Sequence, residues 1–175
     1  MILNLLKKIA TSLNEKHISY MLSGSMALNY YSVPRMTLDI DIIIELFEEN
    51  LPDFLSIFKD GYYLDPETVI EEIKLNRMFN AIDYETGFKV DFILRKNSEY
   101  RKLEFSRRRK INIAYFDVWI VSPEDLIISK IEWIQQYQSE KQKNDIIQLL
   151  KTPEIDYNYI LKWCKNLNLN TFDLI

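Results

Sequence analysis

The sequence predicts an α/β domain with a mixed sheet flanked by helices and a helical C-terminal segment. Three observations predict this class. Short runs rich in Ile and Val alternate with amphipathic segments. Two apolar runs flank the loop 85–87, as in a β-hairpin. From Ser122 onward every segment has helical character. We expect an α/β core over residues 1–121 and helices over 122–175 that pack on it as one compact unit.

Each element up to residue 75 has a local reason. Apolar residues at steps of three and four predict an opening helix: Ile2, Leu5, Leu6, Ile9 and Leu13. A strand follows over 18–22, and Ser25 is expected to cap the next helix. That helix should end near Ser32, because Pro34 disfavours helical geometry in the residue before it. The other elements expected here are a strand over 37–46 and helices over 48–59 and 66–75.

The rest of the chain continues with a hairpin and ends in helices. Ser122, Pro123 and Asp125 predict a helix start, with a capping serine, proline at the first position and an acid three residues after the cap. The expected elements are strands over 78–84, 88–94, 111–114 and 116–121 and helices over 97–108, 123–138, 140–151 and 156–167.

Composition excludes several classes of protein. The 175 residues include 47% hydrophobic and 27% charged residues, and the net charge of −4 argues against a dedicated nucleic-acid binder, although a local basic patch stays open. No stretch approaches the about 18 apolar residues of a membrane span. Lys7 and Lys8 interrupt the N-terminal apolar run, so we expect no signal peptide. The one cysteine, Cys164, forms no internal disulfide, which favours a cytoplasmic location.

Three aspartates interrupt apolar strands. Asp39 and Asp41 are two residues apart, so both project from one face of a strand while isoleucines occupy the other. Their repulsion would be removed by a divalent cation, and oxygen ligands suit Mg²⁺ or Mn²⁺. Asp91 lies in the middle of another apolar strand. Singly, each would be a solvated strand end; together they predict a metal site.

Gly24-Ser25 lies at a strand-to-helix turn. The glycine permits close backbone approach, and the free N–H groups of a helix start bind anions. Simple helix capping is the alternative. Gly24-Ser25 is followed, after thirteen residues, by Asp39-Ile40-Asp41-Ile42. This pattern resembles the hG[GS]…Dh[DE]h signature of the DNA polymerase β-like nucleotidyltransferase superfamily.

Within that superfamily the chain is similar to the AbiEii-like toxin nucleotidyltransferases. Arg35 and Thr37 precede the two aspartates, and Lys130 and Asp145 match the downstream lysine and aspartate of the group. The similarity covers about residues 18–150, and the chain is short for a full AbiEii toxin.

The resemblance implies a nucleotidyltransferase fold and transfer of a nucleoside monophosphate from a nucleoside triphosphate to a hydroxyl, with Mg²⁺ or Mn²⁺. The acceptor would be RNA, a protein or a small molecule, and a toxin would have an antitoxin partner. A non-catalytic nucleotide-binding module, such as an antitoxin or regulatory subunit, is the alternative. The implied catalytic and metal residues are Asp39, Asp41 and Asp91. The implied nucleotide-binding residues are Gly24, Ser25, Arg35, Thr37, Lys130 and Asp145.

Two interpretations stay open for each of three features: Lys130, Asp145 and the basic segment 101–110. Lys130 lies within an apolar helix face, so its amine either reaches an anion or extends to solvent. Asp145 is either the implied family residue or a solvated helix acid. The basic segment 101–110 follows the strand with Asp91, so we expect it to begin close to the predicted metal site. It is either a solvated face or a phosphate-contacting patch for a nucleotide or RNA.

Overall fold

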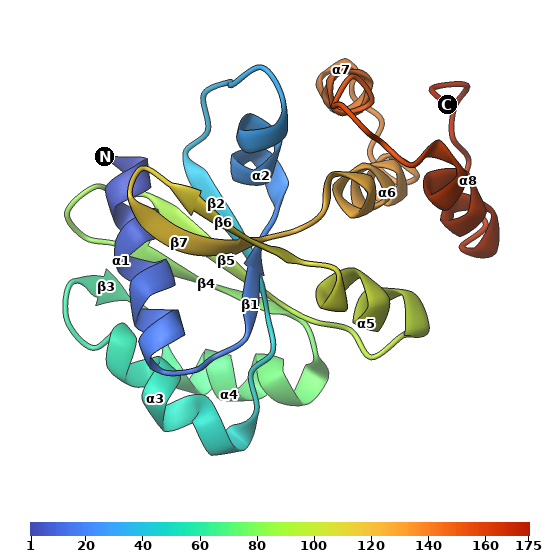
Figure 1. Ribbon diagram of the computed structural model, residues 1–175. Helices are drawn as coiled ribbons and strands as arrows, with labels where there is room; N and C mark the ends of the chain where they lie inside the picture. The colour runs from blue at the N-terminus through green and yellow to red at the C-terminus, as the bar shows by residue number, and fades with distance from the viewer.

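A seven-stranded mixed sheet organises the chain in the computed structural model, which describes all 175 residues (Figure 1). Its strand order is β3-β4-β5-β2-β1-β7-β6. The strands are β1 (Tyr20–Leu22), β2 (Asp39–Ile44), β3 (Tyr62–Tyr63), β4 (Met78–Asp83), β5 (Lys89–Leu94), β6 (Arg109–Ile113) and β7 (Phe116–Ile120). The pairs β1–β7 and β2–β5 are parallel and the other four are antiparallel. The predicted mixed α/β class is confirmed.

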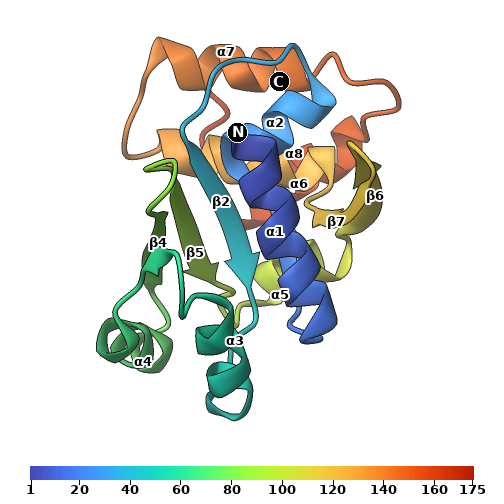
Figure 2. The same cartoon turned by 90° about the vertical axis from the view of Figure 1, so that its left-hand side faces the viewer.

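Helices surround the sheet and form the C-terminal segment. They are α1 (Ile2–Glu15), α2 (Gly24–Tyr31), α3 (Leu51–Ile57), α4 (Pro66–Leu75), α5 (Glu99–Ser106), α6 (Pro123–Ile134), α7 (Glu140–Leu149) and α8 (Tyr157–Asn166). Helix α2 packs on β2 and also on α6 and α7, and α6 packs on α7 and α8. Figure 2 shows α7 beyond the end of the sheet at which β2 begins. None of the helices has both the length and the apolar character needed to cross a membrane.

The β2 strand connects the acidic motif to the core. Ile40, Ile42 and Ile44 are fully buried, while the residues between them are only partly buried. This alternation follows from the two-residue repeat of a strand. It places Asp39 and Asp41 on the face of the sheet opposite the buried isoleucines.

Several predicted boundaries and one cap are wrong. Ser23, not Ser25, precedes α2, and it makes no side-chain cap. The expected helix over 48–59 is a 3₁₀ turn (Glu48–Asn50) followed by α3, and the short strand β3 was not predicted. The strand predicted over 111–114 is β6, which begins two residues earlier, at Arg109. It ends before Ala114, because Ala114 has a positive φ and belongs to the turn to β7.

Candidate active site

The start of α2 lies against the carboxylate of Asp41. The Ser23 N–H donates to the Asp41 carbonyl at 2.9 Å, which fixes the strand-to-helix turn next to β2. Gly24 has a φ of +56°, and a Cβ built on it would lie only 1.8 Å from Asp41 Oδ2. A side chain at residue 24 is therefore incompatible with this position of Asp41. Glycine is required here both for backbone conformation and for space.

Asp41 and Asp91 are neighbours on adjacent parallel strands. They are direct register partners in the β2–β5 pair, and Asp39 is opposite Lys89. Burial, together with the nearby charges of Asp39 and Asp91, raises the pKa of Asp41 to about 6. The Ser25 backbone N–H and the more distant Lys130 partly oppose this effect. The structure thus brings the three predicted acids together.

Two of these acids have partners within the chain. The Lys89 ammonium lies 2.8 Å from Asp91 Oδ2, and the Thr37 hydroxyl donates to Asp39 Oδ1 at 2.6 Å. In this arrangement no group of three or more His, Cys, Asp or Glu side chains is placed to hold a metal ion. However, Asp91 Oδ1 is buried without any hydrogen-bond partner. A buried oxygen without a donor beside a carboxylate with a raised pKa fits a divalent cation, which binds oxygen ligands.

A second polar cluster lies between α2, α6 and α7. The Arg35 guanidinium donates to both carboxylate oxygens of Asp145, at 3.1 and 2.9 Å, and to the Ser25 hydroxyl at 2.8 Å. The Lys130 ammonium donates to Asp145 Oδ2 at 2.9 Å and to Gln142 at 3.2 Å. Burial alone would raise the pKa of Asp145, but the hydrogen bonds from Arg35 and Lys130 lower it. We call these residues the Arg35–Asp145–Lys130 cluster.

This cluster decides two open interpretations. Asp145 is 3% exposed, so the solvated-acid interpretation is wrong. Lys130 is 7% exposed and does reach an anion, which is a carboxylate of the chain itself. Arg35 and Asp145 are far apart in the sequence, and no spacing could predict this pairing.

Lys89 is the site residue that the sequence interpretation missed. A lysine at a strand start is usually solvated, and this side chain is indeed half-exposed. A signal was nevertheless present, because Lys89 and Asp91 are two residues apart and hence share one face of the strand.

The basic segment 101–110 lies away from the acids. Asp91 belongs to the first half of β5, whereas α5 begins after the other end of that strand (Figure 1). Most of its cations also have partners: Arg101 pairs with Glu104 and Glu132, Arg107 with Asp125, and Lys110 with Asp117. The expectation that this segment begins near the predicted metal site is wrong.

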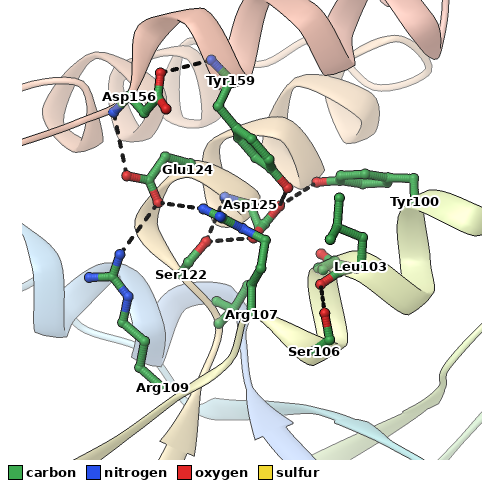
Figure 3. Close-up of polar contacts among 12 residues, drawn as sticks. Tyr100, Leu103, Ser106, Arg107, Arg109, Ser122, Glu124, Asp125, Asp156 and Tyr159 are labelled. Atoms are coloured by element: carbon green, nitrogen blue, oxygen red, sulfur yellow. Dashed lines mark hydrogen bonds and ion pairs between the residues drawn. The ribbon is translucent and has the colours of Figure 1, made fainter.

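Arg107 belongs to a buried network around Asp125 (Figure 3). Asp125 is fully buried and accepts hydrogen bonds from Arg107 at 2.9 Å, Tyr159 at 2.7 Å and Tyr100 at 3.2 Å. The Ser122 hydroxyl donates to it at 2.6 Å and caps α6, as predicted. The network therefore connects α5 and α8 to the start of α6.

Replacing Arg107 by Ala should lower the free energy of unfolding by about 2 kcal/mol, because Asp125 loses its one cationic partner in a buried position. Arg109→Ala is the matched control, since the Arg109 side chain is half-exposed and its ion pair with Glu124 is long, at 3.7 Å. Its effect should stay within about 0.5 kcal/mol. Urea unfolding measures both variants. Equal losses would show that the buried Asp125 does not depend on Arg107.

Solved structures similar to this one are nucleotidyltransferases. The structure of ANT(2″)-Ia in complex with adenylyl-2″-tobramycin is 14% identical, with a TM-score of 0.65 over 94% of this chain and 95% of that chain. The lincosamide antibiotic adenylyltransferase LnuA, with lincomycin bound, is 13% identical, with a TM-score of 0.55 over 82% and 92%. A nucleotidyltransferase-like protein from Paracoccidioides brasiliensis is 17% identical, with a TM-score of 0.53 over 94% and 85%.

These likenesses show that the chain has the nucleotidyltransferase fold that its sequence predicted. No family model matches the chain, and no curated protein matches it significantly. The similarity to the AbiEii-like group therefore stays a prediction.

Proposed function

We propose that this protein, which has the fold of the nucleotidyltransferases, transfers a nucleoside monophosphate from a nucleoside triphosphate to a hydroxyl group of a small molecule, with a divalent cation. One observation carries the proposal. Gly24 leaves room for the Asp41 carboxylate against the start of α2, and Asp41 is paired in register with the buried Asp91. An arrangement that brings poorly solvated carboxylates together costs stability unless a cation neutralises them, which points to a functional site.

The acids and the helix start have different roles in this proposal. Asp39, Asp41 and Asp91 would hold Mg²⁺ or Mn²⁺, which when bound neutralises charge on the transferred phosphate. The Asp91 carboxylate, besides holding the cation, would help to deprotonate the acceptor hydroxyl. Such positioned carboxylates are sufficient because phosphoryl transfer needs alignment and charge stabilisation more than a nucleophilic side chain.

The remaining predicted residues would hold the triphosphate. Gly24 and Ser25 begin α2, where the helix dipole favours an anion, and the Ser25 N–H already serves one, the Asp41 carboxylate. Arg35 and Lys130 carry two positive charges against one on Asp145, so the cluster has a net positive charge next to α2. Lys130 is close enough to Asp41 to affect its pKa, which puts this charge near the acids. Thr37 would orient Asp39.

The contacts of the basic segment favour a small acceptor over RNA. An RNA acceptor needs several free Lys or Arg side chains for its phosphates. In the 101–110 segment Arg101, Arg107, Arg109 and Lys110 instead pair with acids of the chain, and Arg108 lies over the rings of Phe105 and Trp119. Lys102 is left as the one exposed cation of the segment without such a contact, too few for an RNA backbone. Two of the similar solved proteins are described with an antibiotic or its adenylylated form.

A toxin role with an antitoxin partner is the second candidate. It is supported by one observation: Arg35, Lys130 and Asp145, on which the AbiEii-like resemblance depends, meet in one cluster. In that case the acceptor would be RNA or a protein of the cell.

Labelled transfer would test the proposed reaction. The protein would be incubated with each of the four α-³²P-labelled nucleoside triphosphates, Mg²⁺, and a panel of aminoglycosides and lincosamides, with total RNA and cell lysate as parallel acceptors. We expect a labelled small molecule and pyrophosphate, both abolished by EDTA. Label in RNA or in a lysate protein would favour the toxin role. Nucleotide binding that needs no cation, with no pyrophosphate from any acceptor, would instead indicate a non-catalytic module.

A further inference from the structure

Lys89 is the one basic residue in ion-pair contact with the acidic site. Its ammonium lies 2.8 Å from Asp91 Oδ2, and the strand register places Lys89 opposite Asp39. Neither Asp39 nor Asp41 forms an ion pair, and the buried amine of Lys130 is bound to Asp145. The negative charges of Asp39, Asp41 and Asp91 therefore share a single contacting cation from the chain.

The two partners differ in their freedom to move. The Asp91 side chain is 7% exposed and lies within the sheet, so it cannot leave the site. The Lys89 side chain is 45% exposed and can turn toward solvent. A lysine side chain can rotate about four bonds and is a compact charge that binds phosphate readily. The ion pair can thus open on the lysine side while the carboxylate stays in place.

We propose that Lys89 is a resident counter-ion of the acidic site, which a divalent cation displaces from Asp91 and which then contacts a phosphate of the nucleotide. This inference rests on the proposed function. Before the cation binds, the ammonium offsets repulsion between Asp41 and Asp91. After displacement, a phosphate oxygen of the triphosphate is the anion left for Lys89, because the carboxylates are then bound to the cation. Lys89 is in this respect a positioning and binding residue.

The proposal predicts opposite effects of one substitution on two ligands. In Lys89→Met, Mn²⁺ alone should bind about twofold to fivefold more tightly than in the wild type, as expected when a partly exposed competing ion pair is removed. The nucleotide probe is an α,β-methylene triphosphate analogue, with whichever of the four bases the wild type binds most tightly. With saturating Mn²⁺, Lys89→Met should bind this analogue roughly tenfold more weakly than the wild type does, since a charge-assisted hydrogen bond is lost. Calorimetric titration measures both affinities without turnover.

Lys110→Met is the matched control. Lys110 also lies on a strand, is 54% exposed and forms a 2.8 Å ion pair with an aspartate, Asp117, but it belongs to the β6 edge of the sheet. Lys110→Met should bind both Mn²⁺ and the nucleotide analogue as tightly as the wild type does.

Melting of the metal-free protein adds a further readout. Lys89→Met should lower the melting temperature in the wild-type background and not in an Asp91→Asn background.

The outcomes separate this inference from the proposed function. If the wild type binds Mn²⁺ and nucleotide but Lys89→Met behaves like Lys110→Met, the role of Lys89 is refuted and the proposed function stands. If Lys89→Met weakens Mn²⁺ binding, the amine supports the cation and the displacement model is wrong. If the wild type binds no Mn²⁺ even with nucleotide, both the metal-dependent function and this inference are rejected.

Discussion

Asp41→Asn is expected to lower nucleotidyl transfer at least about 1,000-fold and yet to stabilise the metal-free protein by about 2 to 3 kcal/mol at pH 7.5. The activity is lost because an amide cannot replace the charge of a carboxylate in cation binding. Stability rises because the folded protein no longer confines a charge that burial, Asp39 and Asp91 all oppose. The Asn side-chain oxygen can still accept a hydrogen bond from the Ser25 N–H.

The stabilisation should depend on pH in a defined direction. In the folded protein the pKa of Asp41 is raised from 3.8 to about 6. Below pH 4 the group is protonated in both the folded and the unfolded state, so Asp41 carries no penalty. Between about pH 4 and 6 the unfolded chain releases its proton first, and the stability of the wild type falls as the pH rises. Above pH 6 the penalty is complete, and the difference between the wild type and Asp41→Asn should be constant.

Urea unfolding from pH 4 to 8 measures this difference, with and without Mg²⁺. Mg²⁺ should stabilise the wild type and not Asp41→Asn, because only the wild type binds it. Asp117→Asn is the control: Asp117 is a half-exposed strand aspartate whose pKa is lowered by Lys110 and Asn112, so its loss should not stabilise the protein. A wild-type rate of transfer in Asp41→Asn would refute the site.

Features set by local sequence were predictable, and contacts between distant segments were not. The Gly24-Ser25 turn and the β2 motif each lie within a few residues, so spacing alone placed Asp39 and Asp41 on one face. The β2–β5 register that adds Asp91 was suggested only by an acid in an apolar strand. The pairing of Arg35 with Asp145 depends on how α7 packs near α2, which no local pattern encodes.

The errors have separate physical origins. The basic segment was expected near the acids because it follows β5 in the sequence. However, β2 and β5 are parallel, so the acids lie toward the start of both strands and the chain leaves β5 at the other end. The two-residue strand β3 is too short for a two-residue repeat to be recognised. Ser25 is not the cap because the helix begins two residues earlier than expected, at Gly24, where the chain lies against Asp41.

Gly24→Ala is expected to abolish most of the activity and to lower the free energy of unfolding by about 2 to 4 kcal/mol. The added methyl group would lie 1.8 Å from Asp41 Oδ2 and 2.8 Å from Asp41 Cβ, so either the carboxylate or the start of α2 must move. The positive φ of +56° adds backbone strain for any residue with a Cβ. Displacement of Asp41 would misalign it with Asp91, and small misplacements of catalytic groups reduce rates strongly.

Gly87→Ala separates the two costs. Gly87 also has a positive φ, +70°, but nothing lies within 4 Å of the Cβ that alanine would add. Gly87→Ala should therefore lower the free energy of unfolding only by the backbone strain, about 1 kcal/mol, and keep the wild-type rate of transfer. The difference between the two variants measures the contact of residue 24 with Asp41. If Gly24→Ala retained activity and were no less stable than Gly87→Ala, the Asp41 carboxylate would not need its place against α2, and the observation that carries the proposed function would lose its force.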